Sequence, residues 1–164
     1  MGIMDYLKKI IPEGVLPKVL EYIKEIGVDE FVELIPKTQV FKQMLMDKMG
    51  DLSKKMVEKY NIEDYDYVIE SENEKTKIEV TLVIRDESKA KEFMDKLKST
   101  VVESVKLPLV KSFIKKYDVK VNCRKVDTGV EVVVTGNSRL KEFVEGILGG
   151  DVIVGREEGN EKRF

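Results

Sequence analysis

Residues 78–97 read IEVTLVIRDESKAKEFMDKL and contain the change in hydrophobic period that decides the fold. Over residues 78–84 an apolar side chain occurs at every second position, which is the period of a strand with one buried face. From Ala90 onward the apolar residues fall three or four positions apart, as in an amphipathic helix. Asp86 or Ser88, between the two patterns, can cap that helix. The stretch therefore predicts a strand followed at once by a helix.

A second strand is predicted directly before this one. Tyr65, Tyr67 and Ile69 alternate with acidic residues and a valine, and the polar run Glu72–Lys77 predicts a turn. The two strands together predict an antiparallel hairpin with one buried face and one face turned mostly to solvent.

The strand–strand–helix pattern recurs later in the chain. Residues 67–97 and 117–147, compared at a constant offset of fifty, share eight identical residues, including Phe93 and Phe143 in the two helices. A hairpin with one helix cannot enclose a core alone, so two copies on one sheet are the expected solution. The sequence thus predicts an α+β fold in which a duplicated ββα unit forms a mainly antiparallel sheet covered by helices, as a two-layer sandwich.

The first sixty residues predict helices that pack on this sheet. One helix ends at Gly27, a short one is closed by Pro36, and a longer one carries an apolar stripe from Phe41 to Tyr60. The expected organisation is residues 1–60 as a helical segment, 61–155 as the duplicated domain with a last short strand at 151–155, and 156–164 as a flexible polar tail.

The composition excludes several kinds of catalysis. The chain has 164 residues, with no histidine, no tryptophan and one cysteine. Without histidine there is no Ser–His or Cys–His nucleophile pair and no imidazole base that titrates near neutral pH. Chemistry by Asp, Glu, Lys or Tyr stays open, but no group of residues predicts a catalytic centre. We therefore expect a non-enzymatic protein without a cofactor.

Other features of the sequence bear on the cellular location and the source of the protein. No apolar run approaches the roughly 18 residues needed to cross a bilayer, and the N-terminus lacks the pattern of a signal peptide. A cytoplasmic protein is therefore expected. Lysine outnumbers arginine 24 to 5 and glutamine occurs twice, a composition typical of proteins from hyperthermophiles.

An acidic cluster and the single cysteine are possible metal ligands. Carboxylates could hold Mg²⁺ or Ca²⁺, but Asp64, Asp66 and Glu70 fall on the outward face of a predicted strand, where acids protect a sheet edge. Cys123 takes an inward strand position, where a free cysteine acts as a small hydrophobic residue. Neither pattern predicts a metal site.

Methionines concentrate in the helical segment, which holds six of the seven. Methionine repacks around varied partners, and helices over a curved sheet can leave an apolar cavity. A small apolar molecule, another protein or a second copy of the chain could bind there, although the same residues could simply fill a core. The candidate binding residues are Met44, Met46, Met49 and Met56.

Basic residues concentrate over residues 89–125, which hold eleven lysines and arginines against four acids. Such charges can bind phosphate backbones without reading sequence. The isoelectric point of about 5.5 and the scarcity of arginine argue against this use. A binding or assembly module is thus the first hypothesis, and a nucleic-acid-binding protein is the alternative. Its candidate residues are Lys111, Lys115, Lys116, Lys120, Arg124 and Lys125.

Overall fold

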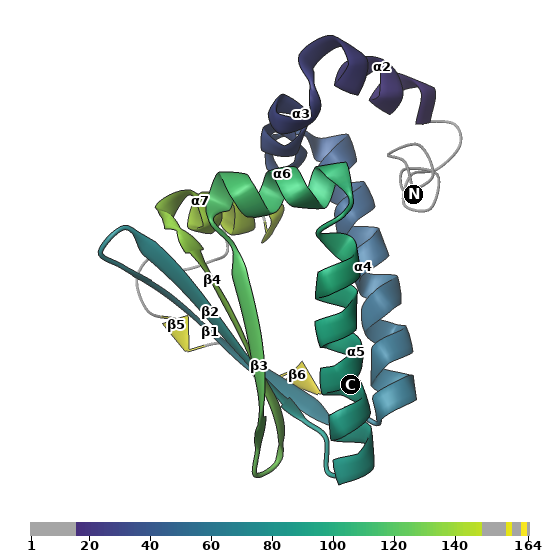
Figure 1. Ribbon diagram of the computed structural model, residues 1–164, viewed down its shortest axis with the longest axis vertical. Helices are drawn as coiled ribbons and strands as arrows, with labels where there is room; N and C mark the ends of the chain where they lie inside the picture. Colours follow the sequence, from purple (N-terminus) through teal and green to yellow (C-terminus); the bar gives the residue numbers. More distant parts are fainter. Residues whose placement is uncertain (1–15, 149–156, 159–161, 164) are drawn as a thin grey trace.

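The computed structural model describes residues 16–148, 157–158 and 162–163. Helices cover one face of an antiparallel sheet, which confirms the α+β, two-layer architecture (Figure 1). The helices of this part are α2 (Leu16–Ile26), α3 (Val28–Leu34), the short 3-10 helix η1 (Ile35–Lys37), α4 (Gln39–Tyr60), α5 (Glu87–Ser104), α6 (Pro108–Tyr117) and α7 (Ser138–Leu148). The strands are β1 (Asp64–Glu72), β2 (Lys75–Val83), β3 (Lys120–Val126), β4 (Gly129–Asn137), β5 (Glu157–Glu158) and β6 (Lys162–Arg163).

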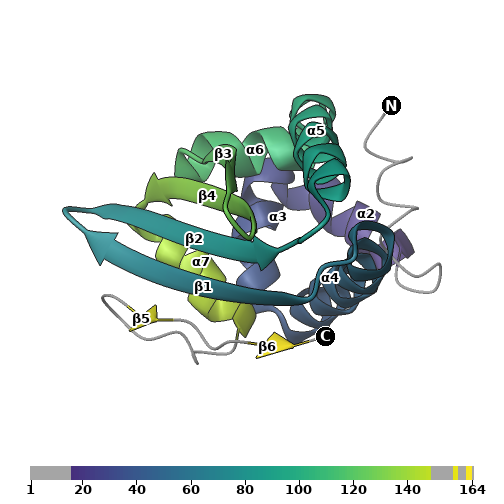
Figure 2. The same ribbon diagram turned by 90° about the horizontal axis from the view of Figure 1, so that it is seen from below.

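The long strands lie in the order β3-β4-β2-β1, and all their pairings are antiparallel. The short strands β5 and β6 pair with the outer edge of β1 (Figure 2). Parts of the segment expected to be a loose tail, 156–164, therefore lie against the sheet. The strand expected at 151–155 falls outside the described residues.

The first hairpin turns more tightly than the sequence predicts. Asn73 and Glu74 alone connect β1 to β2, and both have positive φ, 51° and 64°. Two successive left-handed residues give a turn whose twist matches that of the strands it joins. The turn expected over Glu72–Lys77 is therefore only two residues long, and both strands continue to it.

Alternation along the strands separates a helix-facing side of the sheet from an outer side. Val80, Val132 and Cys123 are cross-strand neighbours in β2, β4 and β3, and Val132 and Cys123 pack against a core under the helices. On the outer side Arg124 binds Glu131, with 2.8 Å between Nε and Oε1. The sheet thus buries one face only, as the sequence predicts.

Two hydrophobic cores lie beneath the helices, and α4 contributes to both. Phe41 near the start of α4 belongs to the first, and Tyr60 at its end belongs to the second. The first, called the α6 core, contains Phe31, Val32, Phe41, Leu109, Tyr117 and Leu140. The second, called the α5 core, contains Tyr60, Ile62, Ile84, Ala90, Phe93 and Val130.

The order strand–strand–helix occurs twice, as β1-β2-α5 and β3-β4-α7, with α6 between the two groups. The spacing differs from the expected constant offset of fifty. β2 begins at residue 75 and β4 at residue 129, fifty-four positions later, whereas α5 and α7 begin at residues 87 and 138, fifty-one apart. Tyr67 lies in β1, but its predicted counterpart Tyr117 ends α6. The gap-free offset does not hold in the hairpins, and the duplication itself stays a prediction.

Helix boundaries follow the signals that the sequence contains. The Asp86 carboxylate accepts hydrogen bonds from the backbone N–H groups of Ser88 and Lys89 and so caps α5. Pro108 occupies the first turn of α6, where its missing N–H has no consequence. Asn61 ends α4 in the left-handed conformation that asparagine tolerates.

Candidate functional site

The four candidate methionines divide into two pairs. Met44 packs against the α6 core and Met56 against the α5 core, so both are part of the fold. Met46 and Met49 are exposed, at 38% and 49%. All four methionines lie on α4, as the sequence predicts, but only Met46 and Met49 are exposed enough to contact a partner.

The middle of α4 is exposed because the helix spans the distance between its two anchored ends. Every residue from 49 to 55 is exposed, including Leu52 at 47%. Met46, Met49, Gly50 and Ser53 follow the spacing i, i+3, i+4, i+7 and therefore share one side of the helix. We call these four residues the outer α4 face. It combines two large apolar side chains with two small residues.

The six basic candidates do not act as one free set of charges. Lys116 lies 3.3 Å from the carboxylate of Glu33, and Arg124 is paired with Glu131. The Lys125 ammonium donates to the backbone oxygen of Val126 at 2.6 Å. Lys111 and Lys115 are exposed one turn apart on α6, and Lys120 is exposed on β3. Lys116, Arg124 and Lys125, which were predicted to bind phosphates, thus already interact with groups of the fold itself.

Glu33 joins three helices through its carboxylate. It lies on α3, accepts a hydrogen bond from Arg139 at the start of α7 and pairs with Lys116 of α6. The hydrogen bond from Arg139 is the main cause that lowers the pKa of Glu33 from its usual 4.5; partial burial opposes it and Lys116 reinforces it. Burial also raises the pKa of the neighbouring Tyr117 hydroxyl, whose ring lies 5.8 Å from Arg139. This network fixes α3, and it explains Lys116 as a structural residue.

We expect Glu33→Gln to lower the free energy of unfolding at pH 7 by about 1 kcal/mol, since charged hydrogen bonds are lost from a partly solvated site. A lowered carboxyl pKa contributes stability that is complete above the unfolded-state pKa and disappears as the pH falls through the folded-state value. The difference between wild type and variant should therefore persist from pH 7 to about pH 5 and vanish in stronger acid. Urea melts across this range measure it.

Glu63→Gln is the matched control, because Glu63 pairs with Arg85 where both side chains are more than half exposed. It should change stability by less than about 0.5 kcal/mol at every pH. An equal loss in both variants would contradict the structural role assigned to Glu33.

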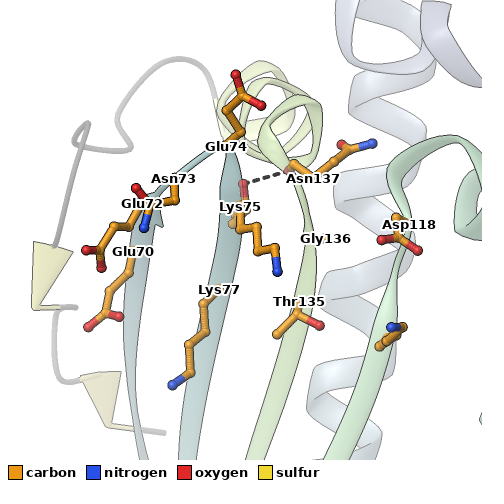
Figure 3. Close-up of a pocket in the computed structure, with 12 residues that line it drawn as sticks. Glu70, Glu72, Asn73, Glu74, Lys75, Lys77, Asp118, Thr135, Gly136 and Asn137 are labelled. Atoms are coloured by element: carbon orange, nitrogen blue, oxygen red, sulfur yellow. Dashed lines mark hydrogen bonds between the residues drawn. The ribbon is translucent and has the colours of Figure 1, made fainter.

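A hollow of about 510 Å³ lies on the outer side of the sheet beside the β1–β2 turn (Figure 3). Three lysines and four acids line it, so it concentrates charge of neither sign. Lys77 pairs with Glu79 at 2.8 Å, and that hydrogen bond is the main cause that raises the pKa of Lys77. The hydrogen bond drawn there runs from the Thr76 hydroxyl to the backbone oxygen of Asn137. The charged residues that line this hollow are Glu70, Glu72, Glu74, Lys75, Lys77, Asp118 and Lys120.

A second hollow, of about 400 Å³, lies between α5 and β3, and five of its seven lining residues have apolar side chains. We call it the α5–β3 groove. Sequence reasoning missed it because its two walls are about twenty residues apart along the chain and each resembles half of a core. One signal was present: Val102 lies off the apolar stripe of its helix and is 60% exposed. The groove is lined by Leu97, Lys98, Val101, Val102, Val121, Asn122 and Cys123.

In the part of the chain that the structure describes, no three His, Cys, Asp or Glu side chains are grouped so that they could hold a metal ion. No helix of that part has both the length and the apolar character to cross a membrane. The apolar surfaces of α4 and of the α5–β3 groove are the features that remain. No family model, curated protein or solved structure matches this chain.

Proposed function

We propose that the protein is a non-enzymatic assembly module whose outer α4 face binds another polypeptide, namely a second copy of the chain. The observation that carries the proposal is the exposure of Met46 and Met49 on one side of a long helix. Clustered apolar side chains on the surface of a folded protein mark interaction sites. Methionine suits such a site because its flexible side chain fits varied surfaces.

Gly50 supports a partner that approaches α4 closely. Glycine in an exposed helix costs about 1 kcal/mol relative to alanine. Apart from the adjoining backbone of α4 itself, no atom of the described residues lies within 4 Å of the position that a Cβ would take. The monomer therefore supplies no reason for glycine here, whereas a second helix packed across this point does.

The position of this face suits a symmetric pair. Residues 49 and 50 are the midpoint of α4, which runs from Gln39 to Tyr60. A twofold axis there would bring the same face of two antiparallel helices together, as an isologous dimer requires.

The alternatives have weaker support. An apolar small molecule needs a hollow that encloses most of its surface, and the apolar hollow of the described residues is an open groove. Nucleic-acid binding retains three exposed lysines that form no ion pair within the described residues, namely Lys111, Lys115 and Lys120. Binding to nucleic acid would weaken steeply as the salt concentration rises, whereas apolar self-association should persist at high salt.

The double variant Met46→Gln, Met49→Gln tests the proposal. Wild type should form a dimer in sedimentation equilibrium and retain it at high salt. The variant should be monomeric, because glutamine preserves helix propensity but removes apolar area from the contact. Its unfolding free energy, measured on dilute monomer, should stay within about 0.5 kcal/mol of wild type because both side chains are exposed.

Two further variants sharpen the result. Gly50→Gln should stabilise the monomer through helix propensity and yet abolish the dimer. Asp51→Gln with Lys55→Gln, on the opposite side of α4, should leave the dimer intact. The proposal is wrong if wild type stays monomeric at about 1 mM, which places the association free energy above about −4 kcal/mol.

A further inference from the structure

β3 forms one edge of the sheet, and in the described part of the chain no strand lies beyond it. The other edge differs, because β5 and β6 pair with β1 there. Figures 1 and 2 show β3 at the border of the sheet, with α5 passing beside it. An edge strand carries N–H and C=O groups that an added strand can pair with. β3 offers seven residues, Lys120–Val126, for such pairing.

The α5–β3 groove adds side-chain contacts beside this edge. Val121 and Cys123 alternate along β3 on the helix-facing side, and both line the groove. Leu97, Val101 and Val102 of α5 form its other wall. Because side chains alternate along a strand, every second residue of an added strand would lie over the groove. Apolar residues at those alternate positions would therefore be recognised.

The charge of the edge strand itself is positive. β3 contains Lys120, Arg124 and Lys125 and no acid. Arg124 is paired with Glu131 of β4, so Lys120 and Lys125 carry the excess charge, and Lys98 is the one charged residue among those that line the groove. Two copies of such a strand placed side by side would repel each other, which is how natural proteins prevent edge-to-edge pairing of identical chains. An acidic strand would be attracted. The edge therefore favours a different protein over a second copy.

We propose that β3 binds an extended acidic segment of a partner protein as an additional strand, with alternate apolar side chains of that segment in the α5–β3 groove. Backbone pairing supplies affinity, and the groove and the lysines supply selectivity. This surface is separate from the outer α4 face, and the inference does not depend on self-assembly.

The probe is an acetylated, amidated heptapeptide in which valine alternates with glutamate, offered to the full chain. Three control peptides separate the contributions. One has the same composition with the valines grouped together, and one has lysine in place of glutamate. The third is N-methylated at alternate residues, so that it lacks the N–H groups that pair with a neighbouring strand.

Cys123 provides a built-in reporter, because it is the single cysteine of the chain and lies half-buried in the groove. The bound alternating peptide should slow the reaction of its thiol with an aromatic disulfide reagent. It should also shift the backbone amide signals of β3 in NMR spectra and protect them from hydrogen exchange. The three control peptides should do neither.

Val102→Gln should weaken binding of the alternating peptide about tenfold, since it removes an apolar contact from the groove. Val102 is 60% exposed, so the variant should fold. Val40→Gln is the matched control: this valine is 52% exposed on α4, away from the groove, and its loss should leave binding unchanged. The double variant of Met46 and Met49 should also bind the peptide as wild type does, which separates this inference from the proposed dimer.

Several outcomes would overturn the inference. Equal binding of the grouped and alternating peptides would exclude pairing in a strand register. Displacement of the peptide by an oligonucleotide of equal charge, with no dependence on Val102, would assign the edge to phosphate backbones. Unchanged thiol reactivity and unchanged β3 amide signals at saturating peptide would remove the site altogether.

Discussion

Replacing Gly129 with alanine should abolish the native fold or destabilise it by about 4 kcal/mol or more, a large share of the stability of a domain this size. Gly129 is buried where β4 begins, opposite Val83 of β2. A Cβ at this position would lie 1.9 Å from the backbone oxygen of Leu82 and 2.6 Å from the backbone nitrogen of Ile84. Both obstacles are backbone atoms, so no side-chain rotation relieves the clash.

The clash lies at the junction between β2 and the start of β4. The Ile84 N–H donates to the backbone oxygen of Thr128 at 2.9 Å, next to the pairing of β2 with β4. Separation of these strands would also disturb Val130, which is fully buried in the α5 core. Far-ultraviolet circular dichroism and urea melts report the loss.

Gly50→Ala is the matched control for this substitution. Gly50 is exposed in the middle of α4, and apart from the adjoining backbone of this helix no atom of the described residues lies within 4 Å of an added Cβ. The same change should therefore stabilise the dilute monomer by about 0.5–1 kcal/mol. Similar effects at the two glycines would contradict the packing around Gly129.

Hydrophobic period predicted the elements of the fold because each face of the sheet and of most helices meets one environment along its whole length. It failed where the environment changes within an element. The stripe of α4 runs regularly from Phe41 to Tyr60, but only its ends reach a core, and Leu52 in its middle is exposed. Whether a turn of a helix is buried depends on which elements pack against it and how far apart they lie. The hydrophobic period of the helix does not contain this information.

Long-range pairing explains the other departures from the sequence prediction. The short pairings of β5 and β6 with β1 depend on the return of a distant polar segment, and that segment has no strand pattern. The α5–β3 groove needs Val101 and Val121 on facing walls, and each valine alone resembles a core residue. The open edge of β3 was not predicted, because the order of the strands depends on long-range pairing. Its basic residues were interpreted as candidates for nucleic-acid binding, although the same charges can protect an edge strand from pairing with its own copies.

Replacing Phe93 with alanine should lower the free energy of unfolding by about 3–5 kcal/mol. The side chain is 3% exposed and lies in the α5 core with Ala90 and Val130, both fully buried. Its ring meets that of Tyr60 edge-on, with 5.4 Å between the ring centres, and so joins the end of α4 to α5. Truncation would leave a cavity between elements that the strands hold in place. The midpoint of a urea melt should fall with little change in its slope.

Phe143→Ala gives the comparison that decides whether the two phenylalanines are equivalent. The alignment at an offset of fifty predicts equal losses, whereas the structure places Phe143 half-buried at the margin of the α6 core. Its ring lies 4.9 Å from Phe113 and 5.3 Å from Tyr117, between ring centres. We expect a loss of about 2 kcal/mol, clearly below that at Phe93, because water already reaches part of the ring and less cavity forms. Equal losses would support equivalent positions in a duplicated unit and contradict the burial described for α7.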